Sequence, residues 1–349
     1  MEATLWRDDA RLARPVAAAG QLHDRRARLF LELRHDGVAG MGEIAPQPER
    51  LHGDPSTGDV VDELRNFTLP AFADAARRES AVPSWTRVAR FAGSRPASPF
   101  AAALVEMAAL DRELRAEGSR LGDLWPATGS TPVTATVSLL DDVEWIVAGA
   151  QRVRAKTAPG ALRASALERL AALDVPVLLD FNCSARGAAD VHVQLLEVAG
   201  VCTVAAVEQP FAPGNLADHA ALAVSLGVAV SLDESVRARR DLDAISHYRA
   251  AAMVCIKPAR VGGLANARAM VLRARDLGLA AYLGGFFESA FARGVHRVLA
   301  DHCVSEPSDL AVVARVDLAG PEAVAVPDGV GVAPGPSVLE GATRLGEFT

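Results

Sequence analysis

One repeated pattern restricts the fold of this chain more than any other feature of its sequence. From about Pro132 onward, short apolar runs that end in a polar residue alternate with stretches of helical period rich in Ala, Leu and Arg. Strands that alternate with helices form a parallel sheet with crossover helices. The predicted strands are Val133–Val137, Arg152–Lys156, Pro176–Asp180, Val204–Glu208, Ala229–Asp233, Met253–Lys257, Ala280–Gly284 and, more weakly, Leu310–Ala314.

The number of these units favours a closed barrel. Eight units in about 180 residues match a (β/α)₈ barrel better than an open sheet. An open doubly wound sheet normally carries a Gly-rich loop after its first strand, and Thr136-Val137-Ser138-Leu139 is no such loop. We therefore predict an α/β protein in which residues 131–315 form the barrel. Its predicted helices include Ala161–Leu173, Val191–Ala199, Leu216–Leu226 and Leu264–Leu277.

Residues 1–130 have a different pattern, in which strands come first and helices follow, as in a separate α+β domain. We expect this domain to cap the barrel and the C-terminal segment 316–349 to pack back on it. The antiparallel strands predicted here are Val16–Gln21, Ala27–Arg34 and Gly37–Gly42, with a turn at His35-Asp36-Gly37. The other predictions are a helix over Ala101–Glu117 that ends at Gly118, a loop or broken helix over Arg78–Pro99, and an irregular tail over Pro327–Thr349.

Composition and charge exclude several classes of function. The net charge is −7, and no basic stripe of the kind that binds nucleic acid is visible. The most apolar stretch, Ala220–Leu232, is too short to cross a membrane, and the N-terminus lacks an apolar signal core, so we expect a cytoplasmic protein. The oligomeric state cannot be predicted. The cysteines are too scattered for a zinc knuckle or a disulfide framework; they are Cys183, Cys202, Cys255 and Cys303.

Charged residues end five consecutive predicted strands. In chain order they are Lys156, Asp180, Glu208, Asp233 and Lys257, spaced 24, 28, 25 and 24 residues apart, which is one unit each. The carboxyl ends of all strands in such a barrel face one shared mouth, where catalysis occurs. A single Asp or Glu at a strand end caps the next helix about three times more often than it binds a ligand. For five such residues in succession, convergence on a site is the better explanation.

Three convergent carboxylates repel one another unless a cation lies between them. Oxygen ligands suit Mg²⁺ better than zinc, with Mn²⁺ as a substitute, so Asp180, Glu208 and Asp233 are the predicted metal ligands. A lysine near a dication has a lowered pKa, which prepares it to act as a base. We therefore predict Lys156 and Lys257 as catalytic residues that remove a proton next to the carboxylate of a small substrate.

The order Lys, Asp, Glu, Asp, Lys resembles that of the muconate-lactonizing subgroup of the enolase superfamily, and the local motifs agree. A Gly-Glu-x-x-Pro motif in the capping domain is also similar. The motifs that carry the resemblance are Arg154-Ala155-Lys156, Asp180-Phe181-Asn182, Glu208-Gln209-Pro210, Asp233-Glu234-Ser235, Lys257-Pro258 with Gly262-Gly263, and Gly42-Glu43-Ile44-Ala45-Pro46.

Within the superfamily, the chain looks most like the o-succinylbenzoate synthases of menaquinone biosynthesis. That likeness implies that Lys156 removes the α-proton and returns it to the departing hydroxide, while Lys257 stays protonated on the opposite face. The alternatives are an N-acylamino-acid racemase, a dipeptide epimerase, a cycloisomerase or a catalytically silent barrel. Leu310–Ala314 lacks the Asp-x-Asp that dipeptide epimerases usually carry, and the two intact lysines count against a silent barrel.

The resemblance also implies supporting residues and shows three departures. In the first departure, Arg154 replaces a lysine. In the second, Cys183 stands where a glycine is common; in the third, Phe286 and Phe287 add bulk to a Gly-Gly…Glu-Ser motif. A loop that holds His23, Arg25 and Arg26 is expected to close over the mouth, where a cation would bind a second carboxylate. The candidate substrate-contacting or supporting residues are Arg154, Asn182, Glu234, Gly285, Glu288 and Arg25.

Overall fold

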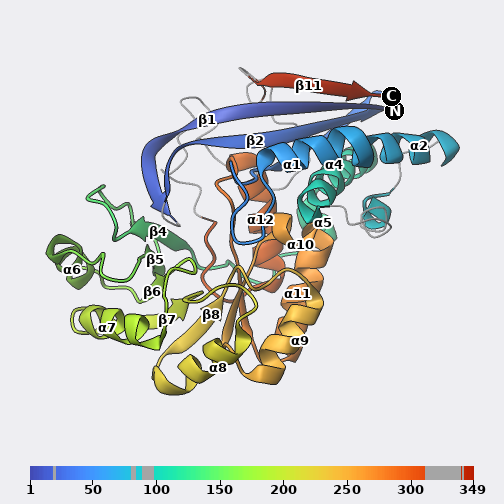
Figure 1. Ribbon diagram of the computed structural model, residues 1–349. Helices are drawn as coiled ribbons and strands as arrows, with labels where there is room; N and C mark the ends of the chain where they lie inside the picture. The colour runs from blue at the N-terminus through green and yellow to red at the C-terminus, as the bar shows by residue number, and fades with distance from the viewer. Residues whose placement is uncertain (19–20, 80–83, 89–97, 311–338, 340–341) are drawn as a thin grey trace.

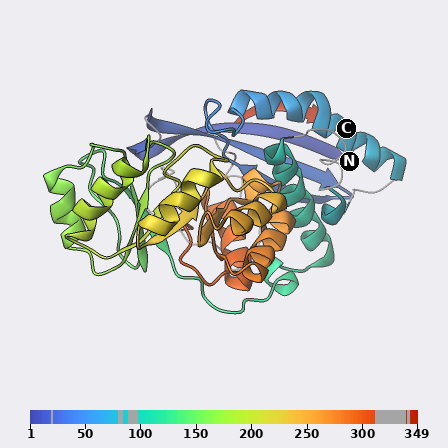
Figure 2. The same ribbon diagram turned by 60° about the horizontal axis from the view of Figure 1, so that its bottom comes forward.

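The computed structural model describes all residues except 19–20, 80–83, 89–97, 311–338 and 340–341. The described chain forms two sheets (Figure 1). One has four strands in the order β11-β1-β2-β3, and the other has seven in the order β10-β9-β8-β7-β6-β5-β4. In both views the strands of the first sheet lie across one end of the second (Figure 2).

The seven-stranded sheet confirms the predicted barrel architecture. Every neighbouring pair is parallel and sequential, as expected when each strand is followed by a crossover segment. Its strands are β4 (Thr134–Ser138), β5 (Arg152–Lys156), β6 (Val177–Asp180), β7 (Val204–Glu208), β8 (Ala229–Leu232), β9 (Met253–Ile256) and β10 (Ala280–Leu283). The helices on its outer side are α6 (Ala164–Ala171), α7 (Ala188–Ala199), α8 (Leu216–Ser225), α9 (Arg239–Tyr248), α10 (Pro258–Val261), α11 (Leu264–Asp276) and α12 (Ala290–Cys303).

The ring is closed by a short segment rather than by a described eighth strand. The backbone N–H of Ser308 donates to Pro132 O, and Ser308 O accepts from Thr134 N, both at 2.9 Å. The next N–H, of Asp309, donates to Leu283 O of β10 at 2.9 Å. These bonds join β4 to β10. The predicted eighth strand, Leu310–Ala314, lies outside the described residues beyond Leu310.

The four-stranded sheet follows the predicted order but is larger than predicted. Its strands are β1 (Glu2–Ala18), β2 (Gln21–His35), β3 (Val38–Ile44) and β11 (Thr343–Phe348). The first strand begins at Glu2 rather than Val16, because Ala3 and Leu5 alternate inward and are fully buried. The prediction of an irregular tail is wrong for β11, which pairs antiparallel with β1. The predicted turn is confirmed: Asp36 and Gly37 both have positive φ, at 49° and 75°.

Four helical segments of the N-terminal part pack with this sheet: α1 (Thr57–Glu63), the π-helical turn η1 (Leu64–Thr68), α2 (Leu69–Glu79) and α4 (Pro99–Glu117). The short helix α5 (Leu121–Leu124) packs on the barrel side, against α12. The predicted helix over 101–117 is confirmed as α4, which ends at Gly118 with a φ of 66°. The predicted loop from Arg78 is partly wrong, because α2 continues to Glu79 and residues 85–88 form a helical turn. Residues 80–83 and 89–97 of that segment lie outside the described residues, and α4 begins at its last residue, Pro99.

Two neighbouring residues of β3 connect the capping sheet to its surroundings, one to the cap helix α4 and one to the barrel. On β3, a Cβ at Gly42 would lie 2.4 Å from Leu104 O of α4, so only glycine permits this packing. Next to it, the buried Glu43 accepts hydrogen bonds from the N-terminus of α12, from Ser289 N at 2.6 Å and Ala292 N at 3.2 Å. Glu43 therefore joins the cap to the barrel, while Gly42 lets β3 pack closely on the cap helix α4. Among the described residues, no helix is long and apolar enough to span a membrane.

Candidate active site

The structure brings the five predicted strand-end residues together. Lys156, Asp180 and Glu208 are the last residues of β5, β6 and β7 and are register partners across the sheet. Asp233 and Lys257 directly follow β8 and β9. All three carboxylates are at most 1% exposed. Since β6, β7 and β8 lie between β5 and β9, the carboxylates separate the two lysines, as the sequence pattern predicts.

A pocket between the cap and the barrel mouth receives both lysines. Its floor and walls come from the strand ends, and its roof comes from the β2 strand and the segment after β3. The residues that line it are Arg26, Gln47, Leu51, His52, Asp54, Arg154, Lys156, Asn182, Glu234, Lys257, Arg260, Gly285, Phe286, Phe287, Arg293 and Asp309.

The lysines are also distinctive in the sequence as a whole. Lys156 and Lys257 are the only two lysines among the 349 residues, since all other members of the 36 Lys and Arg residues are arginines. Arginine keeps its proton at any ordinary pH, whereas a lysine can release it and act as a base. Both amines that could act as bases in this chain therefore lie in one pocket.

Lys156 is held by two oxygen atoms at the end of β6. Its Nζ donates to Asp180 Oδ2 at 3.0 Å and to Asn182 Oδ1 at 2.7 Å. The Asn182 side chain in turn donates to Glu234 Oε1 at 3.3 Å. Asn182 and Glu234, both predicted as supporting residues, therefore connect the first lysine to the residue that follows Asp233.

Lys257 is held by Asp233, one of the three predicted metal ligands. Its Nζ lies 2.8 Å from Asp233 Oδ2, while Arg260 Nη1 lies 2.5 Å from Asp233 Oδ1. Burial lowers the pKa of Lys257, but the charge of Asp233 outweighs it, so this pKa lies above its ordinary value. The lowered lysine pKa was predicted for a site that holds a dication, so it stays a prediction for the metal-bound enzyme.

Glu208 is the most deeply enclosed of the three carboxylates. Its Oε2 lies 3.2 Å from Arg154 Nε and accepts a hydrogen bond from the Tyr282 hydroxyl at 2.7 Å. Burial and the charges of Asp180 and Asp233 together raise the pKa of Glu208 to about 8, against the lowering effect of Arg154. A cation placed among these groups would relieve that repulsion.

The donor set fits a divalent cation. Oxygen atoms of Glu208, Asp233 and the Cys255 sulfur lie within 4.8 Å of one another. Glu208 Oε1 and Glu234 Oε2 are buried without a hydrogen-bond partner, so acceptors are left for an ion. Glu208 and Asp233 supply oxygen ligands, the kind that Mg²⁺ prefers. Asp180 is not in that cluster, and its Oδ2 faces Lys156.

The predicted residues of the β10 loop have local structural roles. A Cβ at Gly285 would lie 2.4 Å from Glu288 Oε2, and the same oxygen accepts a hydrogen bond from Phe286 N at 2.8 Å. Phe286 is buried, and its ring faces the Lys257 amine at 4.7 Å and the Arg260 guanidinium at 5.1 Å. The first phenylalanine is therefore a wall that both cations contact.

The prediction that Arg25 lies in a loop at the mouth is wrong. Arg25 lies within strand β2 and is exposed, and the alternation of the strand points its neighbour Arg26 inward instead. Arg26 is 1% exposed, lines the pocket and donates to Phe286 O at 3.0 Å. His23 lies in the part of β2 whose side chains are outside the description. Cys183 has a φ of 64°, a conformation that explains why a glycine suits its position.

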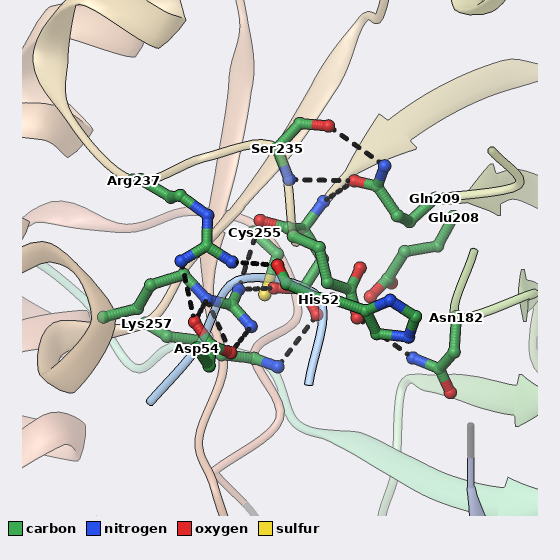
Figure 3. A network of polar contacts seen from close by, with 12 residues as sticks. His52, Asp54, Asn182, Glu208, Gln209, Ser235, Arg237, Cys255 and Lys257 are labelled. Atoms are coloured by element: carbon green, nitrogen blue, oxygen red, sulfur yellow. Dashed lines mark hydrogen bonds and ion pairs between the residues drawn. The ribbon is translucent and has the colours of Figure 1, made fainter. Parts of the chain in front are cut away.

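Two functional residues were missed by the sequence analysis. Arg260 follows Lys257 by three residues, one helical turn, so the sequence did carry a signal for it. Asp54 comes from the cap, and nothing in its local sequence marks it. Ion pairs join both residues to Arg237, Asp233 and Lys257 in one network, of which Figure 3 labels Asp54, Arg237 and Lys257.

Comparison with known proteins agrees with this architecture. Residues 141–335, more than half of the chain, match the family described as "Enolase C-terminal domain-like". An N-succinylamino acid racemase of Amycolatopsis sp. is 29% identical over 341 residues, which cover 91% of this chain and 90% of that protein. An o-succinylbenzoate synthase of Enterococcus faecalis is 25% identical over 314 residues, with coverages of 86% and 83%. The crystal structure of an enolase superfamily member from Listeria innocua matches with a TM-score of 0.79 at 20% identity, covering 99% of this chain and 97% of that one. These matches, on a barrel that carries the strand-end lysines and carboxylates, show that the chain is an enzyme of the enolase superfamily.

Proposed function

We propose that this enzyme removes the proton α to the carboxylate of a small substrate, with Lys156 as the base. The observation that carries the proposal is the placement of the chain's two lysines on either side of three buried carboxylates in one pocket. As a free amine, Lys156 takes the proton, and the electron pair of the C–H bond moves into the substrate carboxylate. Lys257, still an ammonium, faces the resulting negative charge from the other side.

The reaction that we assign first is the dehydration of 2-succinyl-6-hydroxy-2,4-cyclohexadiene-1-carboxylate to o-succinylbenzoate, a lyase step of menaquinone biosynthesis. After proton removal, the ammonium of Lys156 returns the same proton to the departing hydroxyl on that face. The C–O bond breaks, water leaves and the ring becomes aromatic, so proton and electron counts balance. The likeness to o-succinylbenzoate synthases supports this assignment.

The group that completes the site is a divalent cation, Mg²⁺ or Mn²⁺. Asp180, Glu208 and Asp233 would hold it. When bound, it would supply positive charge next to the substrate carboxylate, where negative charge accumulates as the proton leaves. Arg154 and Tyr282 hold Glu208 in place for that role.

Racemisation of an N-succinylamino acid is the second candidate. The observation that favours it is the position of Lys257 in the same pocket, paired with Asp233 as Lys156 is paired with Asp180. In a racemase, one lysine removes the proton and the other delivers one to the opposite face. The likeness to the Amycolatopsis racemase supports this candidate.

The first experiment follows the absorbance of the cyclohexadiene substrate in the presence of Mg²⁺. Turnover that is abolished by EDTA and in Lys156→Ala supports the synthase assignment. Lys156→Arg is the matched variant: it keeps the charge next to Asp180 but cannot accept a proton, so we expect it to be as inactive as Lys156→Ala. If Lys156→Arg retains full activity, Lys156 is not the base.

A second experiment separates the two candidates. Each enantiomer of an N-succinylamino acid is incubated with the enzyme in deuterium oxide, and α-deuteration is measured by mass spectrometry. Exchange and racemisation without dehydration of the cyclohexadiene would replace the synthase assignment by the racemase. If the wild-type protein catalyses neither reaction, the proposed proton abstraction on these substrates is refuted.

A further inference from the structure

A carboxylate of the cap reaches into the charge network of the barrel. Asp54, in the segment between β3 and α1, is 2% exposed, although its position in a connecting segment would suggest exposure. Its two oxygens accept from Arg260 Nε at 3.0 and 3.2 Å and from Arg260 Nη2 at 2.8 Å. Arg237 Nη1 donates to the same carboxylate at 2.9 Å.

The grip on Arg260 fixes the direction of its remaining nitrogen. A guanidinium is planar and rigid, so a carboxylate that binds Nε and Nη2 together determines where Nη1 points. That nitrogen points at Asp233, lying 2.5 Å from Oδ1 and 3.2 Å from the backbone carbonyl oxygen. The Arg260 side chain is 2% exposed, so water does not compete for these positions.

With one oxygen of Asp233 occupied, the other is left for the lysine. Asp233 Oδ2 lies 2.8 Å from Lys257 Nζ, and the ring of Phe286 faces both cations from the other side. Without Asp54, the two cations would share a single carboxylate, and Arg260 would be free to rotate onto the oxygen that now holds the lysine. A continuous series of ion pairs thus connects Asp54 of the cap to the Lys257 amine, and Figure 3 labels both of these residues.

We propose that Asp54 is a positioning residue that, through Arg260 and Asp233, holds the Lys257 amine for its role on one face of the substrate. The effect of Asp54 on catalysis rests on the proposed function. Its effect on the position of the Lys257 amine does not. It makes the assembly of one half of the site depend on the seating of the cap over the barrel.

Asp54 also anchors the cap segment, which is a role separate from positioning the Lys257 amine. A variant of Arg237 distinguishes these two roles. The Arg237 side chain donates to the carbonyl oxygens of His52 and Gly53 as well as to Asp54, and these bonds do not involve Asp233. Arg237→Gln therefore loosens the cap segment while Arg260 keeps both of its carboxylates. It is the matched control for Asp54→Asn.

The two-lysine composition gives a direct measurement. Protein grown with ¹³Cε-lysine gives two lysine signals, assigned by Lys156→Arg and Lys257→Arg, and neither substrate nor Mg²⁺ is needed. We expect Asp54→Asn to move the Lys257 signal and leave the Lys156 signal in place, while Arg237→Gln moves neither. Asp54→Glu, which keeps the charge, should give a Lys257 signal between those of the wild type and Asp54→Asn, and it serves if Asp54→Asn does not fold. An unmoved Lys257 signal in Asp54→Asn would overturn the proposal. Movement of both lysine signals by the same amount in Asp54→Asn and in Arg237→Gln would also overturn it.

Exchange kinetics test the catalytic consequence. The enantiomer of an N-succinylamino acid whose deuteration depends on each lysine is first identified with Lys156→Ala and Lys257→Ala. Asp54→Asn should lower the Lys257-dependent exchange roughly 10- to 100-fold and change the Lys156-dependent exchange by less than about threefold. Equal losses on both faces would overturn the positioning role. If the wild-type protein exchanges neither enantiomer, the proposed function fails on these substrates, and the lysine signals still decide the role of Asp54.

Discussion

The buried Glu106 gives the sharpest stability prediction, because it lies away from the pocket and its ionisation opposes folding. It lies on the cap helix α4, is 0% exposed, and its carboxylate accepts hydrogen bonds from Leu264 N and Ala265 N at the start of barrel helix α11. Burial raises the pKa of Glu106 from its ordinary 4.5 to about 7, although these two backbone bonds lower it.

The sign of the pH effect follows from proton binding. Between pH 4.5 and 7, the unfolded chain has released this proton while the folded chain still holds it, so stability falls as pH rises. At about 1.4 kcal/mol per pKa unit the full effect is about 3 kcal/mol, and about 2.5 kcal/mol of it falls between pH 5 and 8. Glu106→Gln removes the titration and keeps the side-chain shape. Relative to the wild type, its free energy of unfolding should therefore rise by about 2.5 kcal/mol over that range.

Urea unfolding at pH 5 and pH 8, followed by circular dichroism, measures this difference. Glu117→Gln, at the exposed C-terminal end of the same helix, is the control and should follow the wild type at both pH values. If Glu106→Gln and the wild type change in parallel between pH 5 and 8, the carboxylate is not protonated in the folded state. The account of this cap–barrel contact would then be wrong.

Three further predictions test the packing around the site. Gly263→Ala should destabilise the protein by about 2 kcal/mol or more in urea unfolding, because its Cβ would lie 1.9 Å from Glu106 Oε2 and its φ is 123°; an unchanged midpoint would contradict this. Arg154→Met leaves Glu208 buried without its cation and should cost about 3 kcal/mol, and we expect Arg154→Lys to recover part of this loss in thermal unfolding. Tyr282→Phe removes a 2.7 Å hydrogen bond to Glu208 and should weaken Mg²⁺ binding in calorimetry by about 1 kcal/mol, with equal affinity as the refuting result.

The sequence by itself determined the residues at the barrel mouth. In a parallel barrel, the last residue of every strand faces the same end, so the spacing of Lys156, Asp180, Glu208, Asp233 and Lys257 was enough to predict that they converge. Their local hydrophobic runs form the strands, and no distant contact is needed to place them. Likewise, the Asp36-Gly37 turn and the Gly118 helix end follow from local backbone preferences.

Tertiary structure decided what surrounds those residues. Asp54 and Arg260 are 206 positions apart, and their ion pair exists only because the cap lies over the barrel. The choice of Arg26 rather than Arg25 for the pocket depends on which face of β2 packs inward, a one-residue difference that a loop assignment could not resolve. The ion pair between Lys257 and Asp233 was likewise not predicted, since the sequence does not show which charged side chains at the barrel mouth pair with one another. Strand order follows from short-range periodicity, whereas side-chain partners follow from contacts between segments far apart in the chain.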